Sequence, residues 1–250
     1  MTIVLFGDSL SEGTYSDNWV KKLEKKINHK IENYAVNGAT SSVVRHKLVD
    51  IDDLAPISSN PLAVVILVGG NDLISCTHPE TGNMYVDMFP EILNAPPSIE
   101  LYKKEMNNIV NILDDCLCKS TQVLILSAPP VGEGGPDSIE WETGLQFSEI
   151  CRDAVLKAVF NGSDRFHFRD LYSMVRFEMQ EKKCNRNLKL SLWKMTRNRI
   201  LSYVLSWESI RHLSGFKYSH DGIHFCKEFG DLCTTIVTNW FYDTIYRYEE

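Results

Sequence analysis

Short apolar segments alternate with amphipathic helical segments along this chain, and the alternation is the feature that most constrains its fold. The apolar segments are rich in β-branched and aromatic residues, which is typical of buried strands. They cover residues 2–6, 30–35, 63–68, 122–127 and 166–169. Parallel strands need crossover connections of about a dozen residues or more, and the helical segments supply them. The pattern therefore predicts an α/β fold of three layers, with a five-stranded parallel sheet between helices.

The helical segments are recognised by apolar residues three and four positions apart. In the first segment Trp19, Leu23 and Ile27 follow this spacing, and lysines fill the opposite face. The others are expected over 99–117, with Ser98 as N-cap, over 139–160, and from about 229 to 246. With 250 residues, 44% of them hydrophobic and 24% charged, residues 1–250 are expected to form a single globular domain.

Composition excludes several classes of protein. The apolar runs are far shorter than the roughly 18 to 20 residues that cross a bilayer, so no transmembrane segment is expected. Residues 2–6 lack the basic flank and the length of a secretory signal, so we expect a cytoplasmic protein. The seven cysteines include no C-x-x-C pair and favour neither a disulfide framework nor a zinc site. A pI near 5.5 and the lack of a recognised binding motif argue against a nucleic-acid partner.

Small, polar or turn-forming residues follow four of the expected strands. In parallel α/β sheets the functional site lies at the carboxyl ends of the strands. The four segments cover residues 7–13, 36–40, 69–72 and 128–130. Residues from these segments are therefore expected to meet at one rim of the sheet.

Ser9 stands in the first of these segments and is the candidate nucleophile. A serine needs a neighbouring base, and Asp221 lies three residues before His224, so that one short loop can hold the carboxylate against the imidazole. Gly38 and Asn71 follow two other strands, where a backbone N–H and a side-chain amide can donate to an anion. Together with the N–H of Ser9, these groups form a candidate oxyanion hole.

These motifs resemble those of the GDSL esterase/lipase family, whose members are also called SGNH hydrolases. GDSL stands at Gly7–Leu10, and a glycine block places Gly38 five residues after Asn33. G-x-N-D stands at Gly69–Asp72 and D-x-x-H at Asp221–His224. The resemblance spans about residues 2–175 and 218–246.

The resemblance implies a flavodoxin-like SGNH fold and hydrolysis of carboxylic esters through a covalent acyl-serine. It implies Ser9 as nucleophile, His224 as base and Asp221 as the acid that orients it. Gly38 and Asn71 would complete the oxyanion hole, and no metal or cofactor would be required. The candidate substrates are small carboxylic esters, O-acetylated sugars and lysophospholipids, with the loops 73–98 and 131–141 determining the choice. One departure is Ala35, where many members have a further glycine.

Each site residue also has a structural interpretation. Ser9 could cap a helix, Gly38 and Asn71 could shape turns, and Asp221 with Gly222 could form a tight turn. Asp8 and Asp72 are expected to be structural. His220 and His224 have the H-x-x-x-H spacing of metal ligands, but Gly222 between them favours a loop. The alternative function is a non-catalytic binding module that keeps the fold.

Residues 176–217 depart from the alternation and have no counterpart in compact members of the family. This basic insertion contains ten basic and three acidic residues, together with many apolar ones, although the whole chain has a net charge of −7. It could be a helical hairpin that covers the sheet, a lid over the acyl pocket, or a surface for anionic lipid. The last possibility would make the protein a lysophospholipase in peripheral contact with membranes. The oligomeric state does not follow from the sequence.

Overall fold

The computed structural model describes most of the chain, including all five strands that the sequence predicts. The described residues are 2–49, 60–134, 138–181, 187–188, 197–198, 200–202, 205–215, 219 and 221–246. Within these ranges no helix combines the length and the apolar character that a membrane crossing requires.

The central sheet consists of five parallel strands, which confirms the predicted fold class. The strands are β1 (Ile3–Gly7), β2 (Ile31–Asn33), β3 (Ala63–Leu67), β4 (Gln122–Leu126) and β6 (Phe166–Arg169). Their spatial order is β2-β1-β3-β4-β6. Every residue of β1 and β3 is buried, because helices cover both faces of the sheet at its centre.

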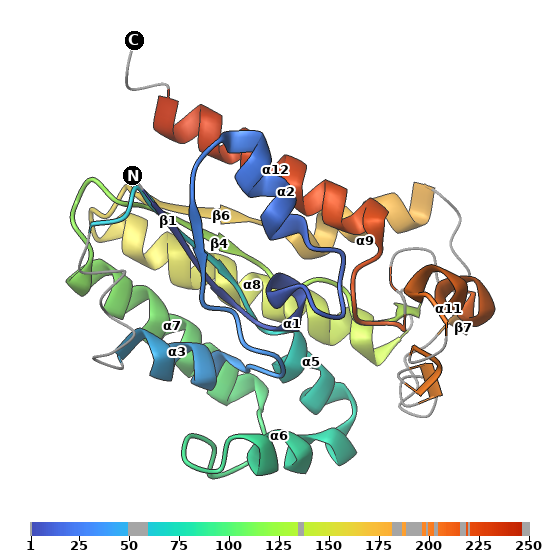
Figure 1. Cartoon of the computed structure of the whole chain (residues 1–250). Coiled ribbons are helices and arrows are strands. Elements are labelled where there is room, and N and C mark those ends of the chain that lie inside the picture. Colours follow the sequence, from blue (N-terminus) through green and yellow to red (C-terminus); the bar gives the residue numbers. More distant parts are fainter. Residues whose placement is uncertain are drawn as a thin grey trace.

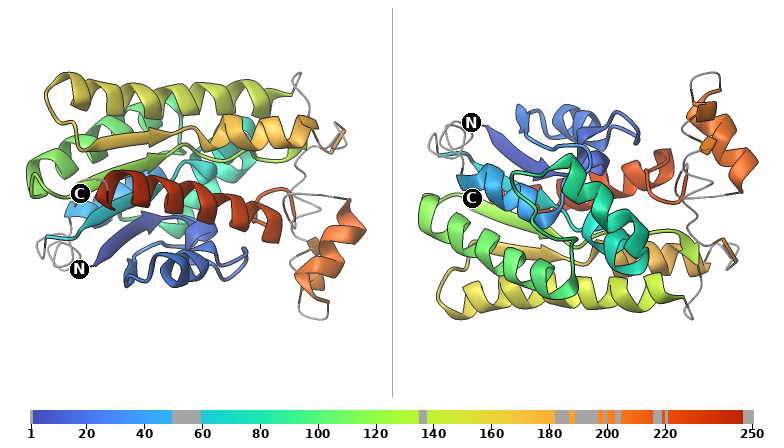
Figure 2. Two further views of the ribbon diagram at one scale, coloured as in Figure 1. Left: turned by 90° about the horizontal axis from the view of Figure 1, so that it is seen from above. Right: turned by 90° about the horizontal axis from the view of Figure 1, so that it is seen from below.

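Two layers of helices enclose this sheet (Figures 1 and 2). On one face α2 (Trp19–Ile27) packs against α12 (Lys227–Ile245). On the other face α3 (Ser41–Val49), α7 (Ile99–Cys116) and α8 (Ile139–Phe160) lie side by side. The expected cap of α7 is present, since the Ser98 side chain accepts a hydrogen bond from Leu101 N at 3.1 Å.

Several shorter elements gather near the carboxyl ends of the strands (Figure 1). They are α1 (Ser9–Glu12), α5 (Gly70–Thr77), η1 (Pro79–Thr81), α6 (Gly82–Met88), α9 (Leu171–Glu181), α11 (Trp207–Ser214), and the paired short strands β5 (Glu133–Gly134) and β7 (Asn187–Leu188). In Figure 1, α6 lies at the bottom and α9, α11 and β7 lie toward the right.

Three differences from the sequence prediction concern this region. The segment 73–98, expected as a loop, contains most of α5 together with η1 and α6. The segment 131–141 contains β5 and the first residues of α8. The first residues of the basic insertion belong to α9, which packs Val175 and Met179 into the core. Much of the remaining insertion, from 182 to 204, lies outside the described residues.

Candidate active site

Ser9 is the first residue of α1, directly beyond the carboxyl end of β1. The carboxylate of Asp8 caps this helix and accepts a hydrogen bond from Leu10 N at 3.0 Å. A Cβ on Gly7 would lie 2.6 Å from the carbonyl oxygen of Leu67, so only glycine allows β1 to approach β3 this closely. The Gly-Asp-Ser sequence thus closes the strand, starts the helix and leaves Ser9 at the rim, where its side chain is mostly buried.

Asp221 and His224 form a closely bonded pair in the loop that precedes α12. His224 Nδ1 lies 2.7 Å from Asp221 Oδ2. The other carboxylate oxygen, Oδ1, accepts the backbone N–H groups of Ile223 and His224 at 3.0 and 2.9 Å. Burial alone would raise the pKa of Asp221, but the charge of His224 and these hydrogen bonds outweigh it and lower the pKa to about 2. Asp221 is therefore an anion that is held against the imidazole at neutral pH.

Two neighbouring segments fix the position of this loop. Gly132 N donates to Gly222 O at 2.6 Å, which ties the loop to the chain that follows β4. Phe225 N donates to Ser16 Oγ at 3.1 Å, which ties it to the chain that follows α1. The ring of His224 consequently lies 5.6 Å from the ring of Tyr15, centroid to centroid.

The structure also brings His224 near the start of α1. Tyr15 and Ser16, which follow α1 closely in the chain, both contact the loop that carries His224. The structure therefore places Ser9, Asp221 and His224 in one region at the carboxyl ends of β1 and β4.

Gly38 and Asn71 lie close together, because Asn71 bonds to the residue that follows Gly38. Gly38 has φ +75°, a conformation that favours glycine, and lies in the turn that follows β2. The side-chain nitrogen of Asn71 donates to the carbonyl oxygen of Ala39 at 2.8 Å. Because β1 lies between β2 and β3, the segments that carry Gly38 and Asn71 flank the segment that carries Ser9.

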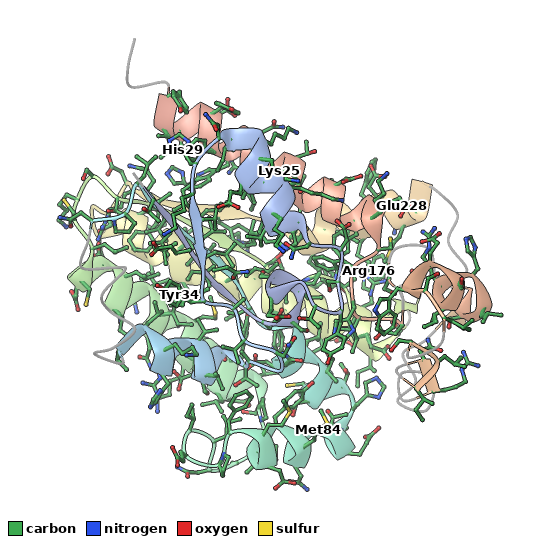
Figure 3. All side chains as sticks on the ribbon, viewed as in Figure 1. Lys25, His29, Tyr34, Met84, Arg176 and Glu228 are labelled. Carbon is green, nitrogen blue, oxygen red and sulfur yellow. The ribbon has the colours of Figure 1, made fainter. Side chains whose placement is uncertain are left out.

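Two residues that the sequence analysis did not single out contact these groups, and both lie on α6. The hydroxyl of Tyr85 donates to Asn71 Oδ1 at 3.0 Å. A Cβ on Gly38 would lie 2.5 Å from Met88 Cε, so the end of that side chain covers Gly38. Met84 and Met88 are about half exposed on this helix, and Figure 3 shows Met84 at the outer edge of the molecule. No periodic signal in residues 82–88 indicates these contacts.

Asp8 and Asp72 have the structural contacts that were expected of them. Asp72 accepts hydrogen bonds from Ser41 N and Ser41 Oγ at 2.9 and 2.7 Å, which joins α5 to the start of α3. Burial raises the pKa of Asp72 to about 6 and that of Asp8 to about 7. Asp8 therefore titrates near neutral pH within the site.

The described part of the basic insertion reaches this region through α11. The ring of Trp207, at the start of α11, lies 6.4 Å from the ring of Tyr15 in an edge-to-face arrangement. Figures 1 and 2 show α11 beyond the carboxyl ends of the strands in every view. The three hypotheses for the insertion stay predictions.

No metal site emerges from the parts of the chain that the structure describes, since no three His, Cys, Asp or Glu side chains there could hold an ion. His220, the other member of the H-x-x-x-H pair, lies outside the described residues.

Comparison with known proteins identifies a family for most of the chain. The family model described as GDSL-like Lipase/Acylhydrolase matches residues 5–174. The match includes Ser9, Gly38 and Asn71 and ends before Asp221 and His224. A comparison with curated protein sequences finds no significant match.

Solved structures of hydrolases share the fold at low sequence identity. A lipase/acylhydrolase from Enterococcus faecalis is 16% identical, with 96% of this chain and 94% of that chain covered and a TM-score of 0.57. A catalytic mutant of an acetylxylan esterase from Geobacillus stearothermophilus is 12% identical, with coverages of 98% and 93% and a TM-score of 0.61. An α/β hydrolase from the metagenome of Lake Arreo is 12% identical, with coverages of 97% and 93% and a TM-score of 0.57.

Proposed function

This chain belongs to the GDSL-like lipase/acylhydrolase family, and we propose that it hydrolyses carboxylic esters through an acyl-enzyme on Ser9. The observation that carries the proposal is the bonded pair of Asp221 and His224 at the same rim as Ser9. A structural turn would account for Asp221 Oδ1, which accepts two backbone N–H groups. It would not require the 2.7 Å contact of Oδ2 with the imidazole.

In the proposed first step, Ser9 Oγ attacks the ester carbonyl while His224 Nε2 takes the hydroxyl proton. The imidazolium then gives this proton to the departing alcohol as the carbon–oxygen bond breaks, which leaves an acyl-serine. In the second step a water molecule attacks the acyl group while His224 takes a proton from the water. The imidazolium returns this proton to Ser9 Oγ as the bond between Oγ and the acyl group breaks, and the acid is released. Asp221 keeps the Nδ1 proton in place and stabilises the imidazolium throughout.

Three donors are available for the oxygen that becomes negatively charged in each step. They are the backbone N–H of Ser9, the backbone N–H of Gly38 and the side-chain amide of Asn71. Removing one such donor typically costs about 2.7 to 4 kcal/mol of transition-state stabilisation. We assign Gly38 and Asn71 to this role because their segments flank Ser9 in the sheet order.

For the substrate we propose a simple ester with a short acyl group. The terminal methyl of Met88 covers Gly38 and thereby fills space next to one of the assigned oxyanion donors. The acetylxylan esterase among the structural neighbours also handles an acetyl group, which agrees with this choice. Replacing Met88 by alanine is expected to shift the preferred acyl chain to a greater length.

The test is hydrolysis of p-nitrophenyl esters from acetate to palmitate by wild type, Ser9→Ala and Ser11→Ala. Ser11 is a matched control, because it is a fully buried serine in the same short helix. We expect turnover that is fastest on short chains, is lost in Ser9→Ala and persists in Ser11→Ala. Turnover that survives in Ser9→Ala would contradict the proposal.

A fluorophosphonate probe separates the enzyme from the non-catalytic binding module. The enzyme is expected to be labelled on Ser9, and the label should disappear in His224→Ala. Folded wild-type protein that takes up no label and hydrolyses no ester would favour the binding module.

A further inference from the structure

The side-chain amide of Asn71 is held by hydrogen bonds at both of its ends. Its nitrogen donates to the carbonyl oxygen of Ala39 at 2.8 Å, and its oxygen accepts from the hydroxyl of Tyr85 at 3.0 Å. Asn71 is 6% exposed and Tyr85 is 3% exposed, so water competes little for either bond. The amide is therefore restrained in a single orientation.

The chemistry of these two partners determines the orientation of the Asn71 amide. A backbone carbonyl can only accept a hydrogen bond, so the NH2 group of Asn71 must face Ala39. The amide oxygen is then the end that accepts the hydrogen bond from the Tyr85 hydroxyl. An amide nitrogen carries two hydrogens in one plane, and the second of them is the donor available to a substrate oxyanion. Tyr85 thus opposes any rotation of the amide that would turn its oxygen toward that anion.

The position of Tyr85 in the fold agrees with this role. Burial raises the pKa of Tyr85 well above its usual range, so the hydroxyl keeps its proton at neutral pH. Tyr85 and Met88 are three residues apart on α6 and therefore lie on neighbouring positions of one face. Through these two side chains, one short helix contacts both Asn71 and Gly38.

We propose that Tyr85 is a positioning residue that holds the Asn71 amide with an N–H directed at the oxyanion. The inference rests on the proposed function, because it concerns the oxyanion hole of that reaction. Tyr85 acts through Asn71 and forms no bond to the reacting atoms.

The experiment is a double-mutant cycle with Tyr85→Phe, Asn71→Ala and the double variant, measured as kcat and KM on p-nitrophenyl acetate. Tyr85→Phe is expected to lower kcat about tenfold with KM nearly unchanged, because a donor used in the transition state is misplaced. Asn71→Ala is expected to lower kcat by about 10² to 10³. In the Asn71→Ala background, Tyr85→Phe should have no further effect.

Tyr102→Phe is the matched control, since this fully buried tyrosine bonds to Cys151 Sγ at 2.7 Å and not to Asn71. It should keep most of the wild-type kcat in either background. Urea unfolding of each variant verifies that it is folded, and the cycle cancels any general effect on the fold.

The possible outcomes are distinct. Loss of kcat in Tyr85→Phe that vanishes in the Asn71→Ala background supports the proposal. The same fold-loss in both backgrounds, no loss at all, or a change in KM alone would overturn it. Ester hydrolysis that does not depend on Ser9 would overturn the proposed function, and the inference with it.

Discussion

Asp8 is a buried carboxyl group. Replacing it by asparagine measures how much the ionisation of this group lowers the free energy of unfolding. Asp8 is 1% exposed and caps α1 through the 3.0 Å bond from Leu10 N to Oδ1. Asparagine has the same shape, is an equally good N-cap and can keep this bond. The substitution Asp8→Asn therefore removes the titrating group while it leaves the cap in place.

The sign and size of the effect follow from the two pKa values. Burial raises the pKa of Asp8 from 3.8 to about 7 in the folded protein. Between these values the unfolded chain releases a proton that the folded protein retains, so the free energy of unfolding falls as the pH rises. The protonated Asp8 carboxyl group makes its full contribution to the free energy of unfolding below pH 4, and this contribution is lost above about pH 7. At about 1.4 kcal/mol for each pH unit, the total loss is about 4 kcal/mol.

The assay is urea unfolding of wild type and Asp8→Asn, followed by tryptophan fluorescence at pH 5, 6, 7 and 8. The cost of burying the new amide N–H groups does not change with pH, and Asp72 titrates in both proteins. Between pH 5 and pH 8 the free energy of unfolding of Asp8→Asn should therefore rise by about 3 kcal/mol relative to that of wild type. Asp243→Asn replaces an exposed aspartate on α12 in the same way and is the control for the substitution itself. Parallel pH curves for wild type and Asp8→Asn would refute the reasoning.

Three further predictions concern activity and stability. Asp221→Asn should lower kcat about 10⁴-fold, since an amide cannot replace the carboxylate opposite the imidazole, and a loss below tenfold on p-nitrophenyl acetate would contradict this. Gly38→Ala should lower kcat about 10²-fold, because an alanine is strained at a φ of +75° and its Cβ would collide with Met88 Cε, so that the backbone N–H is displaced. Adding Met88→Ala removes only the collision and should restore only part of the lost kcat. Arg165→Met should cost about 3 to 5 kcal/mol in urea unfolding, because the buried guanidinium bonds carbonyl groups at the end of α7; a cost below about 1 kcal/mol would contradict that assignment.

The sequence predicts the centre of the sheet well because β1, β3 and β4 are buried almost throughout. Such strands appear as continuous β-branched runs, and β3 and β4 begin at their expected residues. The long helices α7 and α8 follow for a similar reason, since each begins behind a serine cap and buries a recurrent apolar stripe.

The short helices α5 and α6 near the site are not predicted, because their buried residues do not recur with the period of a helix. In α5 nearly every residue is buried, including polar ones such as Asn71 and Asp72, so no polar face marks the helix. In α6 only Gly82 and Tyr85 are buried, and two methionines are half exposed. The bond from Tyr85 to Asn71 depends on how these helices pack, and fourteen residues separate its partners along the chain.

The order of the strands explains why motifs so far apart in the sequence can act together. From β1 the chain crosses to β2 on one side of it, and from β2 it crosses back past β1 to β3 on the other side. Open α/β sheets bind their ligands where the strand order reverses in this way, outside the carboxyl ends of the strands. Ser9 stands at that end, the turn with Gly38 follows β2, and α5 with Asn71 follows β3. Because α12 packs against α2, the loop that precedes α12 brings Asp221 and His224 to the same rim of the sheet from the opposite end of the chain. The proposed chemistry therefore depends on β1 lying between β2 and β3, and α6 contacts both of the residues that we assign to the oxyanion hole.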